Sequence, residues 1–80
     1  MSQLEQYNQI FIDSFGVDAD QLDDNFVYQC VPQWDSVGHM GMITAVEDAF
    51  NIVLDTDDII DFSSYLKGIE ILRKYDVVIE

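Results

Sequence analysis

Hydrophobic residues at helical spacing open the chain. Between Ser2 and Phe15 they recur every three or four positions, which places them on one face of a helix. Ser2 can cap the first turn with Glu5 three residues later, and Gly16 can end the helix in the left-handed conformation. The pattern therefore predicts a helix over residues 2–15. Its apolar face comprises Leu4, Tyr7, Ile10, Phe11 and Phe15.

The helical periodicity is lost over residues 17–35. This segment is rich in Asp and contains the only proline, Pro32, so it predicts a long ordered loop that can include a short helical turn. It also carries too many apolar side chains to leave in water, and we therefore expect it to pack on the helices. These side chains are Val17, Leu22, Phe26, Val27 and Val31.

A second helix is predicted from Asp35-Ser36 to Phe50. Asp35 can accept hydrogen bonds from the free amides of the first turn, and Asn51 can end the helix. A turn of 100° per residue separates two faces of this helix. The expected core face comprises Met42, Ile43, Val46, Ala49 and Phe50.

The opposite face of the second helix combines apolar and acidic residues on the side of the Ser36 hydroxyl. An exposed Val-Met pair beside two acids is typical of a docking surface, although single exposed apolar residues are also ordinary in globular proteins. The predicted partner-binding residues are Val37, Met40, Gly41, Thr44, Glu47 and Asp48.

Two further helices are predicted in the last third of the chain. Asp55 or Thr56 can cap a short third helix ending near Phe62, and Ser63 or Ser64 can cap a fourth that runs to about Tyr75. The expected buried stripe of the fourth helix comprises Leu66, Ile69, Leu72 and Tyr75, and its last turn carries Arg73 and Lys74. Residues 77–79 can extend the packing or form a short strand. The pattern predicts an all-α fold, a small four-helix bundle forming a single domain over residues 1–80.

Composition narrows the function classes. The 80 residues carry a formal net charge of −13, which disfavours nucleic acid and anionic membranes as direct partners. The apolar runs are too short to span a bilayer. The single cysteine, Cys30, cannot form an internal disulfide, and no leader-like segment opens the chain, so we expect a reducing, cytoplasmic location.

The sequence offers little for metal binding or catalysis. The acidic clusters lack the glycine and glutamate spacing of a calcium loop, and one histidine with one cysteine does not make a zinc site, so no metal site is predicted. Ser36 and His39 lie three apart on one helix, but a histidine bordering the core is favoured over a general base. No catalytic residue is predicted. Gly38 and Gly41 weaken a helix, which suggests close approach of another backbone or a partner.

Several of these features occur together in one known family. Asp35-Ser36-Val37 lies about midway along the chain at the predicted start of a helix, the first helix closes in Phe-Gly-Val at 15–17, and Val-Glu-Asp-Ala-Phe follows at 46–50. In this combination the chain resembles the acyl carrier protein family, with Asp-Ser-Val in place of the family's Asp-Ser-Leu. The resemblance covers nearly the whole chain.

The resemblance implies a carrier without catalytic activity of its own. Ser36 would be the hydroxyl to which a phosphopantetheinyl transferase attaches 4′-phosphopantetheine from coenzyme A, and Asp35 would assist recognition by that transferase. The cargo would be an acyl or aminoacyl group held as a thioester. Further implied partners are a loading ligase and downstream transferases or synthases with basic docking patches, which a monomeric acidic carrier would meet through its second helix.

The chain departs from the family at Gly38 and Gly41, where the family's second helix usually carries acids. Glu47 and Asp48 remain as the matching acids. This departure favours a specialised biosynthetic pathway over housekeeping fatty acid synthesis, and it leaves peptidyl-type and D-alanyl-type carriers open. An acidic protein-interaction module without a prosthetic group, in which Ser36 only caps a helix, and a serine hydrolase are competing hypotheses.

Overall fold

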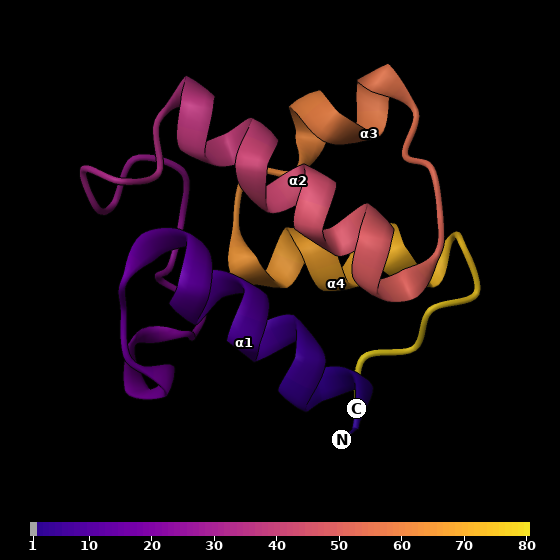
Figure 1. Cartoon of the computed structure of the whole chain (residues 1–80), viewed down its shortest axis with the longest axis horizontal. Helices are drawn as coiled ribbons and strands as arrows, with labels where there is room; N and C mark the ends of the chain where they lie inside the picture. The colour runs from indigo at the N-terminus through magenta and orange to yellow at the C-terminus, as the bar shows by residue number, and fades with distance from the viewer. Residues whose placement is uncertain (1) are drawn as a thin grey trace.

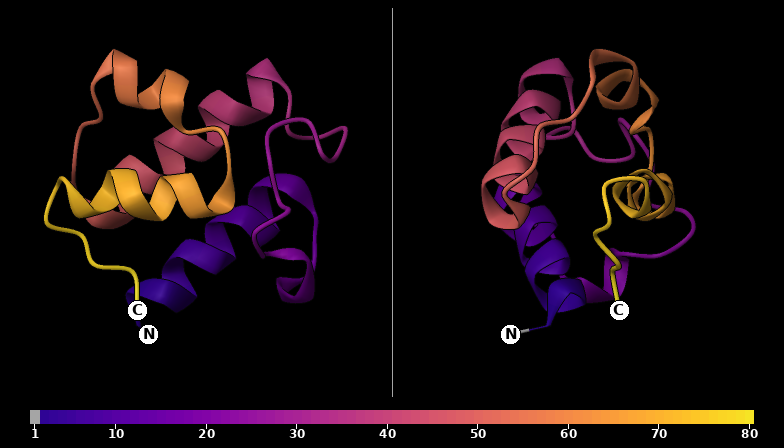
Figure 2. Two further views of the ribbon diagram at one scale, coloured as in Figure 1. Left: turned by 180° about the vertical axis from the view of Figure 1, so that it is seen from behind. Right: turned by 90° about the vertical axis from the view of Figure 1, so that its right-hand side faces the viewer.

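The fold is all-α, as the hydrophobic pattern predicts. The computed structural model describes residues 2–80, and these residues contain no strand (Figure 1). The elements are α1 (Gln3–Phe15), the short 3₁₀ helix η1 (Ala19–Gln21), α2 (Ser36–Phe50), α3 (Thr56–Asp61) and α4 (Tyr65–Arg73). Seen from the side, α1 and α2 lie on one side of the molecule and α3 and α4 on the other (Figure 2).

The helices begin and end close to where the local signals predict, although α4 ends at Arg73, short of the predicted end near Tyr75. The Ser2 hydroxyl accepts a hydrogen bond from the Glu5 amide at 3.1 Å and so caps α1. Gly16 closes α1 in the left-handed conformation at φ 64°, and Asn51 closes α2 in the same way at φ 54°. At α4 the cap is Ser64, whose hydroxyl accepts from the Lys67 amide at 2.9 Å, so the predicted choice between two serines is resolved.

The core is dominated by aromatic rings, and the long loop supplies part of it. Trp34 and Phe26 come from the loop, and both are buried. Phe15 of α1 stacks on Trp34 with ring centroids 5.0 Å apart, and Phe11 meets the same indole edge-on at 5.6 Å. The prediction that the loop packs on the helices is confirmed.

Main-chain hydrogen bonds also tie the loop to the junction between α3 and α4. The Tyr28 amide donates to the Ser63 carbonyl at 2.8 Å, and the Tyr65 amide donates to the Phe26 carbonyl at 2.9 Å. The loop that precedes α2 is therefore held against the residues that join α3 to α4. This contact places Tyr28 and Ser63 close to the start of α2.

Three side chains predicted to pack are exposed, and one of them is Val27 of the long loop, at 41% exposure. Leu66 is 42% exposed and does not belong to the buried stripe of α4, and Ala49 of α2 is exposed. The buried face of α4 is displaced because Gly68 lies on it. A β-carbon at Gly68 would lie 2.2 Å from the Tyr7 hydroxyl and 2.2 Å from the Phe62 ring, so the glycine allows both rings to cross the helix closely. The buried face comprises Tyr65, Gly68, Ile71 and Leu72.

The last residues extend the packing and form no strand. Val77 is 5% exposed and its amide donates to the Leu72 carbonyl at 3.0 Å. Ile79 packs against the core, and the Leu4 amide donates to the Glu80 carbonyl at 3.3 Å. The last residue consequently lies beside the start of α1 (Figure 1).

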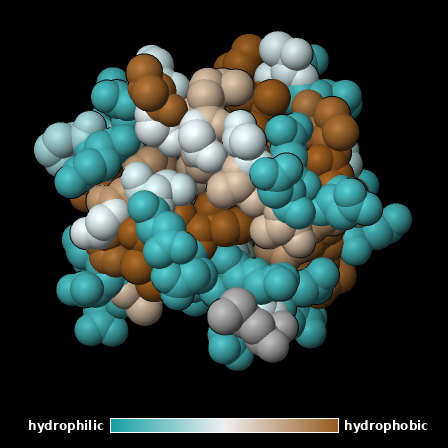
Figure 3. Space-filling model, in the orientation of Figure 1, coloured by the Kyte–Doolittle hydropathy of each residue, from teal (hydrophilic) through white to brown (hydrophobic). Residues whose placement is uncertain are grey.

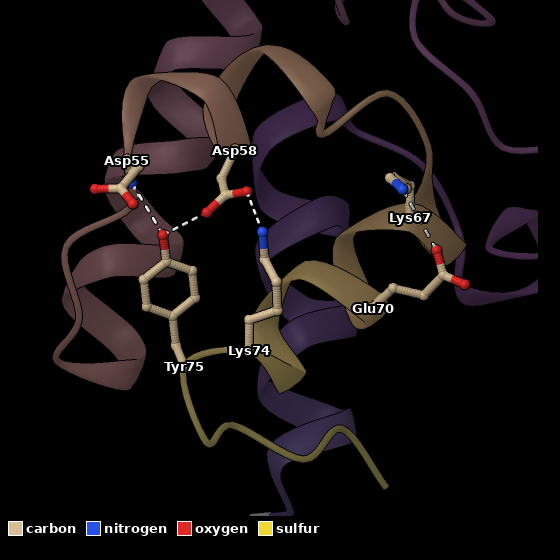
Figure 4. A network of polar contacts seen from close by, with 6 residues as sticks. All are labelled: Asp55, Asp58, Lys67, Glu70, Lys74 and Tyr75. Atoms are coloured by element: carbon tan, nitrogen blue, oxygen red, sulfur yellow. Dashed lines mark hydrogen bonds and ion pairs between the residues drawn. The ribbon is translucent and has the colours of Figure 1, made fainter.

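A polar network joins α3 to the end of α4 (Figure 4). The buried Asp58 carboxylate accepts from Lys74 Nζ at 2.5 Å and from the Tyr75 hydroxyl at 2.5 Å, while that hydroxyl accepts from the Asp55 amide at 3.0 Å. The hydrogen bond from Lys74, followed by that from Tyr75, lowers the pKa of Asp58 below its ordinary value. Lys74 thus pairs with a specific carboxylate, a role that its position at a helix end does not predict.

Candidate functional site

Ser36 occupies the first position of α2 and its side chain is exposed. Asp35 is the N-cap, and its Oδ1 accepts from the Gly38 amide at 2.8 Å, as predicted for this residue. The amides of Ser36 and Val37 have no partner within the helix, because the first amides of any helix lie too early to reach a carbonyl one turn back. A hydroxyl therefore stands at the positive end of a helix of 15 residues.

Gly38 is required by the chain that leads into α2. A β-carbon at this position would lie 2.0 Å from the Gln33 carbonyl oxygen, so the loop can pass against the first turn only because no side chain intervenes. The prediction of a close backbone approach is confirmed here. At Gly41 a β-carbon would have nothing within 4 Å, so no other backbone of the chain approaches there, and the approach of a partner stays a prediction.

His39 connects three parts of the chain. Its Nδ1 accepts from the Trp34 indole N–H at 3.0 Å, and its Nε2 lies 2.8 Å from the Ile59 carbonyl oxygen in α3. The imidazole and indole rings are nearly parallel, with centroids 6.2 Å apart. The prediction that His39 borders the core is confirmed, because the residue is half-buried between the loop and α3.

The Ser36 hydroxyl has a different neighbour. Its hydrogen-bond partner among the described side chains is the Tyr28 hydroxyl, at 3.4 Å, and either oxygen can donate. Both nitrogens of His39 are engaged elsewhere, with Trp34 and Ile59. The histidine three residues along the helix is therefore not paired with the serine.

An open pocket of about 340 Å³ lies beside Ser36. It falls within the size range of small-molecule sites, and its walls are mainly apolar. Its lining residues come from α2, from α3 and the residues that follow it, and from Tyr28 of the long loop. The lining residues are Tyr28, Ser36, His39, Met40, Ile59, Ile60, Phe62 and Ser63.

The predicted partner-binding face of α2 is exposed along most of its length. Val37 is 82% exposed and Met40 is 50% exposed, and Gly41, Thr44 and Asp48 are also exposed. The Thr44 hydroxyl donates to the Met40 carbonyl of its own helix at 3.0 Å. Most of this face is therefore free to contact another molecule.

Glu47 differs from the rest of that face. It is half-buried, and its Oε2 accepts from the Leu54 amide at 2.8 Å. The carboxylate thereby holds the connection between α2 and α3. Of the two acids predicted to bind partners, Asp48 is exposed without such an internal bond, whereas Glu47 has a structural contact that is lost when the side-chain acceptor is removed.

Negative charge dominates the surface. Of the cations, Lys74 pairs with Asp58 and Lys67 pairs loosely with Glu70 at 3.8 Å (Figure 4). Hydrophilic residues cover much of the face seen in Figure 3, with hydrophobic residues exposed between them. With a formal net charge of −13, the chain presents an anionic field to any approaching molecule.

Within residues 2–80, no group of three or more His, Cys, Asp or Glu side chains is arranged to hold a metal ion. None of the helices formed by these residues has the length and hydrophobicity needed to cross a membrane.

Five pocket residues are absent from the predicted site, namely Tyr28, Ile59, Ile60, Phe62 and Ser63. Ile60 is 71% exposed and faces the pocket from α3, and Tyr28 reaches it from the loop. No local pattern marks either residue, because their proximity to Ser36 depends on how α3 and the loop fold back onto α2.

In the comparisons with known proteins, no family model, no curated protein and no solved structure matches the chain.

Proposed function

We propose that the chain is a carrier protein that bears 4′-phosphopantetheine on Ser36 and transports an acyl group attached to it. The observation that carries the proposal is the combination of an exposed Ser36 hydroxyl at the start of α2 with an apolar pocket directly beside it. The resemblance of the Asp-Ser-Val segment and its surroundings to acyl carrier proteins supports the same reading.

The start of α2 suits a phosphodiester on Ser36. The partial positive charge of the helix end and the unpartnered amides of the first turn stabilise an anion there. The Gly38 amide donates to the Asp35 carboxylate, so the amides of Ser36 and Val37 remain free to donate to a phosphate. Asp35 also presents a carboxylate to a transferase that approaches the hydroxyl, as the resemblance implies.

The pocket supports a cargo with an apolar body. When bound, the prosthetic group supplies a terminal thiol that holds the cargo as a thioester. The walls of α2 and α3 expose Met40, Ile59 and Ile60 to the pocket, and apolar surfaces of this kind favour a hydrocarbon over a charged group. We therefore place an acyl cargo ahead of an aminoacyl cargo, with peptidyl-type and D-alanyl-type carriers as the alternatives.

Partner enzymes would bind to the exposed face of α2. Val37 and Met40 offer apolar contact, and Asp48 lies on the same helix within an acidic surface. Transferases, loading ligases and downstream synthases with basic patches would meet this face quickly, because opposite charges steer diffusional encounter. The proposed carrier acts as a monomer in the cytoplasm and has no catalytic step of its own.

The test is the intact mass of the chain after incubation with coenzyme A and a broad-specificity phosphopantetheinyl transferase. The wild type is expected to gain the mass of one phosphopantetheinyl group, and Ser36→Ala is expected to gain none. Ser63→Ala is the matched control, because Ser63 lies at the same pocket and is also exposed. No gain by the folded wild type contradicts the proposal and favours an acidic interaction module in which Ser36 serves only as part of a helix start.

A further inference from the structure

The bridge formed by His39 spans the pocket. Ser36, His39 and Met40 line it from α2, whereas Ile59 and Ile60 line it from α3. The hydrogen bond between His39 Nε2 and the Ile59 carbonyl therefore joins the two walls directly, at 2.8 Å and across 20 residues of sequence.

The hydrogen bonds define one tautomer of His39. An indole N–H can only donate, so His39 Nδ1 is the acceptor in the contact with Trp34. A carbonyl oxygen can only accept, so the Nε2–H donates to Ile59. Trp34 thus orients the ring, and the ring's other nitrogen holds α3.

The helix held in this way depends on contacts with the rest of the chain. α3 has six residues, too few for a helix to be stable by itself in water. Its N-cap, Asp55, makes no side-chain capping bond. The Ile59 carbonyl belongs to the last turn, where carbonyls lack partners within the helix, and His39 supplies the missing donor. On the outer side, Asp58 attaches α3 to the end of α4.

We propose that His39 is the positioning residue that holds α3 as the second wall of the pocket beside Ser36. Trp34 fixes the orientation of the imidazole, and the Nε2–H fixes the separation between α2 and α3. This role requires neither proton transfer nor a prosthetic group on Ser36. It can therefore be tested on the unmodified chain, and its outcome is independent of whether Ser36 is modified.

Two amide substitutions separate the two hydrogen bonds of the ring. His39→Gln places an amide N–H near the position of Nε2, so the donor to Ile59 is retained while the acceptor for Trp34 is lost. His39→Asn places an amide oxygen near Nδ1, so the acceptor for Trp34 is retained while the donor to Ile59 is lost. Met40→Leu is the control, because Met40 lines the same pocket without bridging its walls.

The first measurement is amide hydrogen exchange in α3, divided by exchange in α1 to remove any general loss of stability. The Ile59 and Phe62 amides report on α3, since both are hydrogen-bonded within it. Exchange at these amides is expected to rise on the order of tenfold in His39→Asn, the scale of one lost hydrogen bond. It is expected to stay within about twofold of the wild type in His39→Gln and Met40→Leu.

The second measurement is tryptophan fluorescence, which reports on one residue because Trp34 is the only tryptophan in the chain. Its emission is expected to change in His39→Gln, where the indole loses its acceptor, and to stay near that of the wild type in His39→Asn. This opposite pattern in the two variants would support the assignment. Equal α3 exchange in the Gln and Asn variants, whether both are fast or both unchanged, would overturn it.

Discussion

Replacement of Gly38 by alanine should destabilise the chain, although alanine is the better helix former. In a helix interior the change from glycine to alanine gains about 1 kcal/mol. At Gly38, however, the new β-carbon would lie 2.0 Å from the Gln33 carbonyl oxygen, and separations under 3.0 Å are essentially never observed. The carbonyl must therefore retreat by at least about 1 Å.

That retreat is costly because Trp34 directly follows Gln33. The indole is fully buried and is held by stacking on Phe15 and by its hydrogen bond to His39. Steric overpacking of this kind costs about 1–3 kcal/mol. After the gain in helix propensity, we expect Gly38→Ala to lower the free energy of unfolding by about 1 kcal/mol, with a larger loss if the buried ring shifts.

Gly41→Ala is the matched control on the same helix. Its β-carbon meets nothing within 4 Å, so only the gain in propensity remains, and stability should rise by about 0.5–1 kcal/mol. The two variants should therefore differ by about 2 kcal/mol, which is on the order of 10 °C in melting temperature for a domain of this size. Thermal unfolding followed by circular dichroism measures the difference. A shift of both variants in the same direction by similar amounts would refute the steric reasoning.

Three further predictions concern charge. Asp58→Asn should melt below the wild type at neutral pH, because Lys74 loses its carboxylate partner. The folded pKa of Asp58 lies below the ordinary 3.8, so this stabilisation is present above pH 3.8 and is lost as the pH falls through the folded pKa. The difference in melting temperature should therefore close on acidification, and a wider difference would contradict the pairing. Asp48→Lys should slow phosphopantetheinyl transfer through the association rate at low salt without lowering the melting temperature. Glu47→Lys should slow transfer too, but it should melt below Asp48→Lys because the Leu54 amide loses its acceptor. Transfer rates across a salt series and thermal melts check both variants, and equal melting temperatures would contradict the contact. An increase in sodium chloride from about 0.01 M to about 0.15 M should raise the melting temperature of the wild type, because the Debye length falls from about 30 Å to about 8 Å and repulsion between the acidic side chains is screened more strongly. A melting temperature insensitive to salt would show that this self-repulsion is negligible.

Helix positions could be predicted from the sequence because their signals are local. Ser2, Gly16 and Asn51 each act within one turn of their own position, and the structure has them as caps. The position of Ser36 at the start of α2 follows from the preceding Asp35 for the same reason. Burial was harder to predict: Leu66 has the expected spacing but lies on the wrong side, because Gly68 allows two rings to pack on the neighbouring face.

The parts of the site that the sequence did not reveal depend on contacts between distant segments. His39 meets Ile59 at a separation of 20 residues, and Asp58 meets Lys74 at a separation of 16. No periodicity encodes such pairs, since each depends on where α3 lies once the chain is folded. The close approach at Gly38 could be predicted because a glycine early in a helix is unfavourable unless space requires it. Gly41 carries the same signal but faces open space, so the signal alone does not distinguish a backbone neighbour within the chain from a binding partner.

We propose that Ser36 carries the prosthetic group. The most direct test is to treat the chain with coenzyme A and transferase and to locate the attached group by tandem mass spectrometry. The chain has five serines, and Ser63 lies at the same pocket as Ser36. We expect one phosphopantetheinyl group per chain, located on the serine of the peptide that contains Asp35-Ser36-Val37. A group located on Ser63 or on any other serine, or the absence of modification in the folded chain, would contradict it.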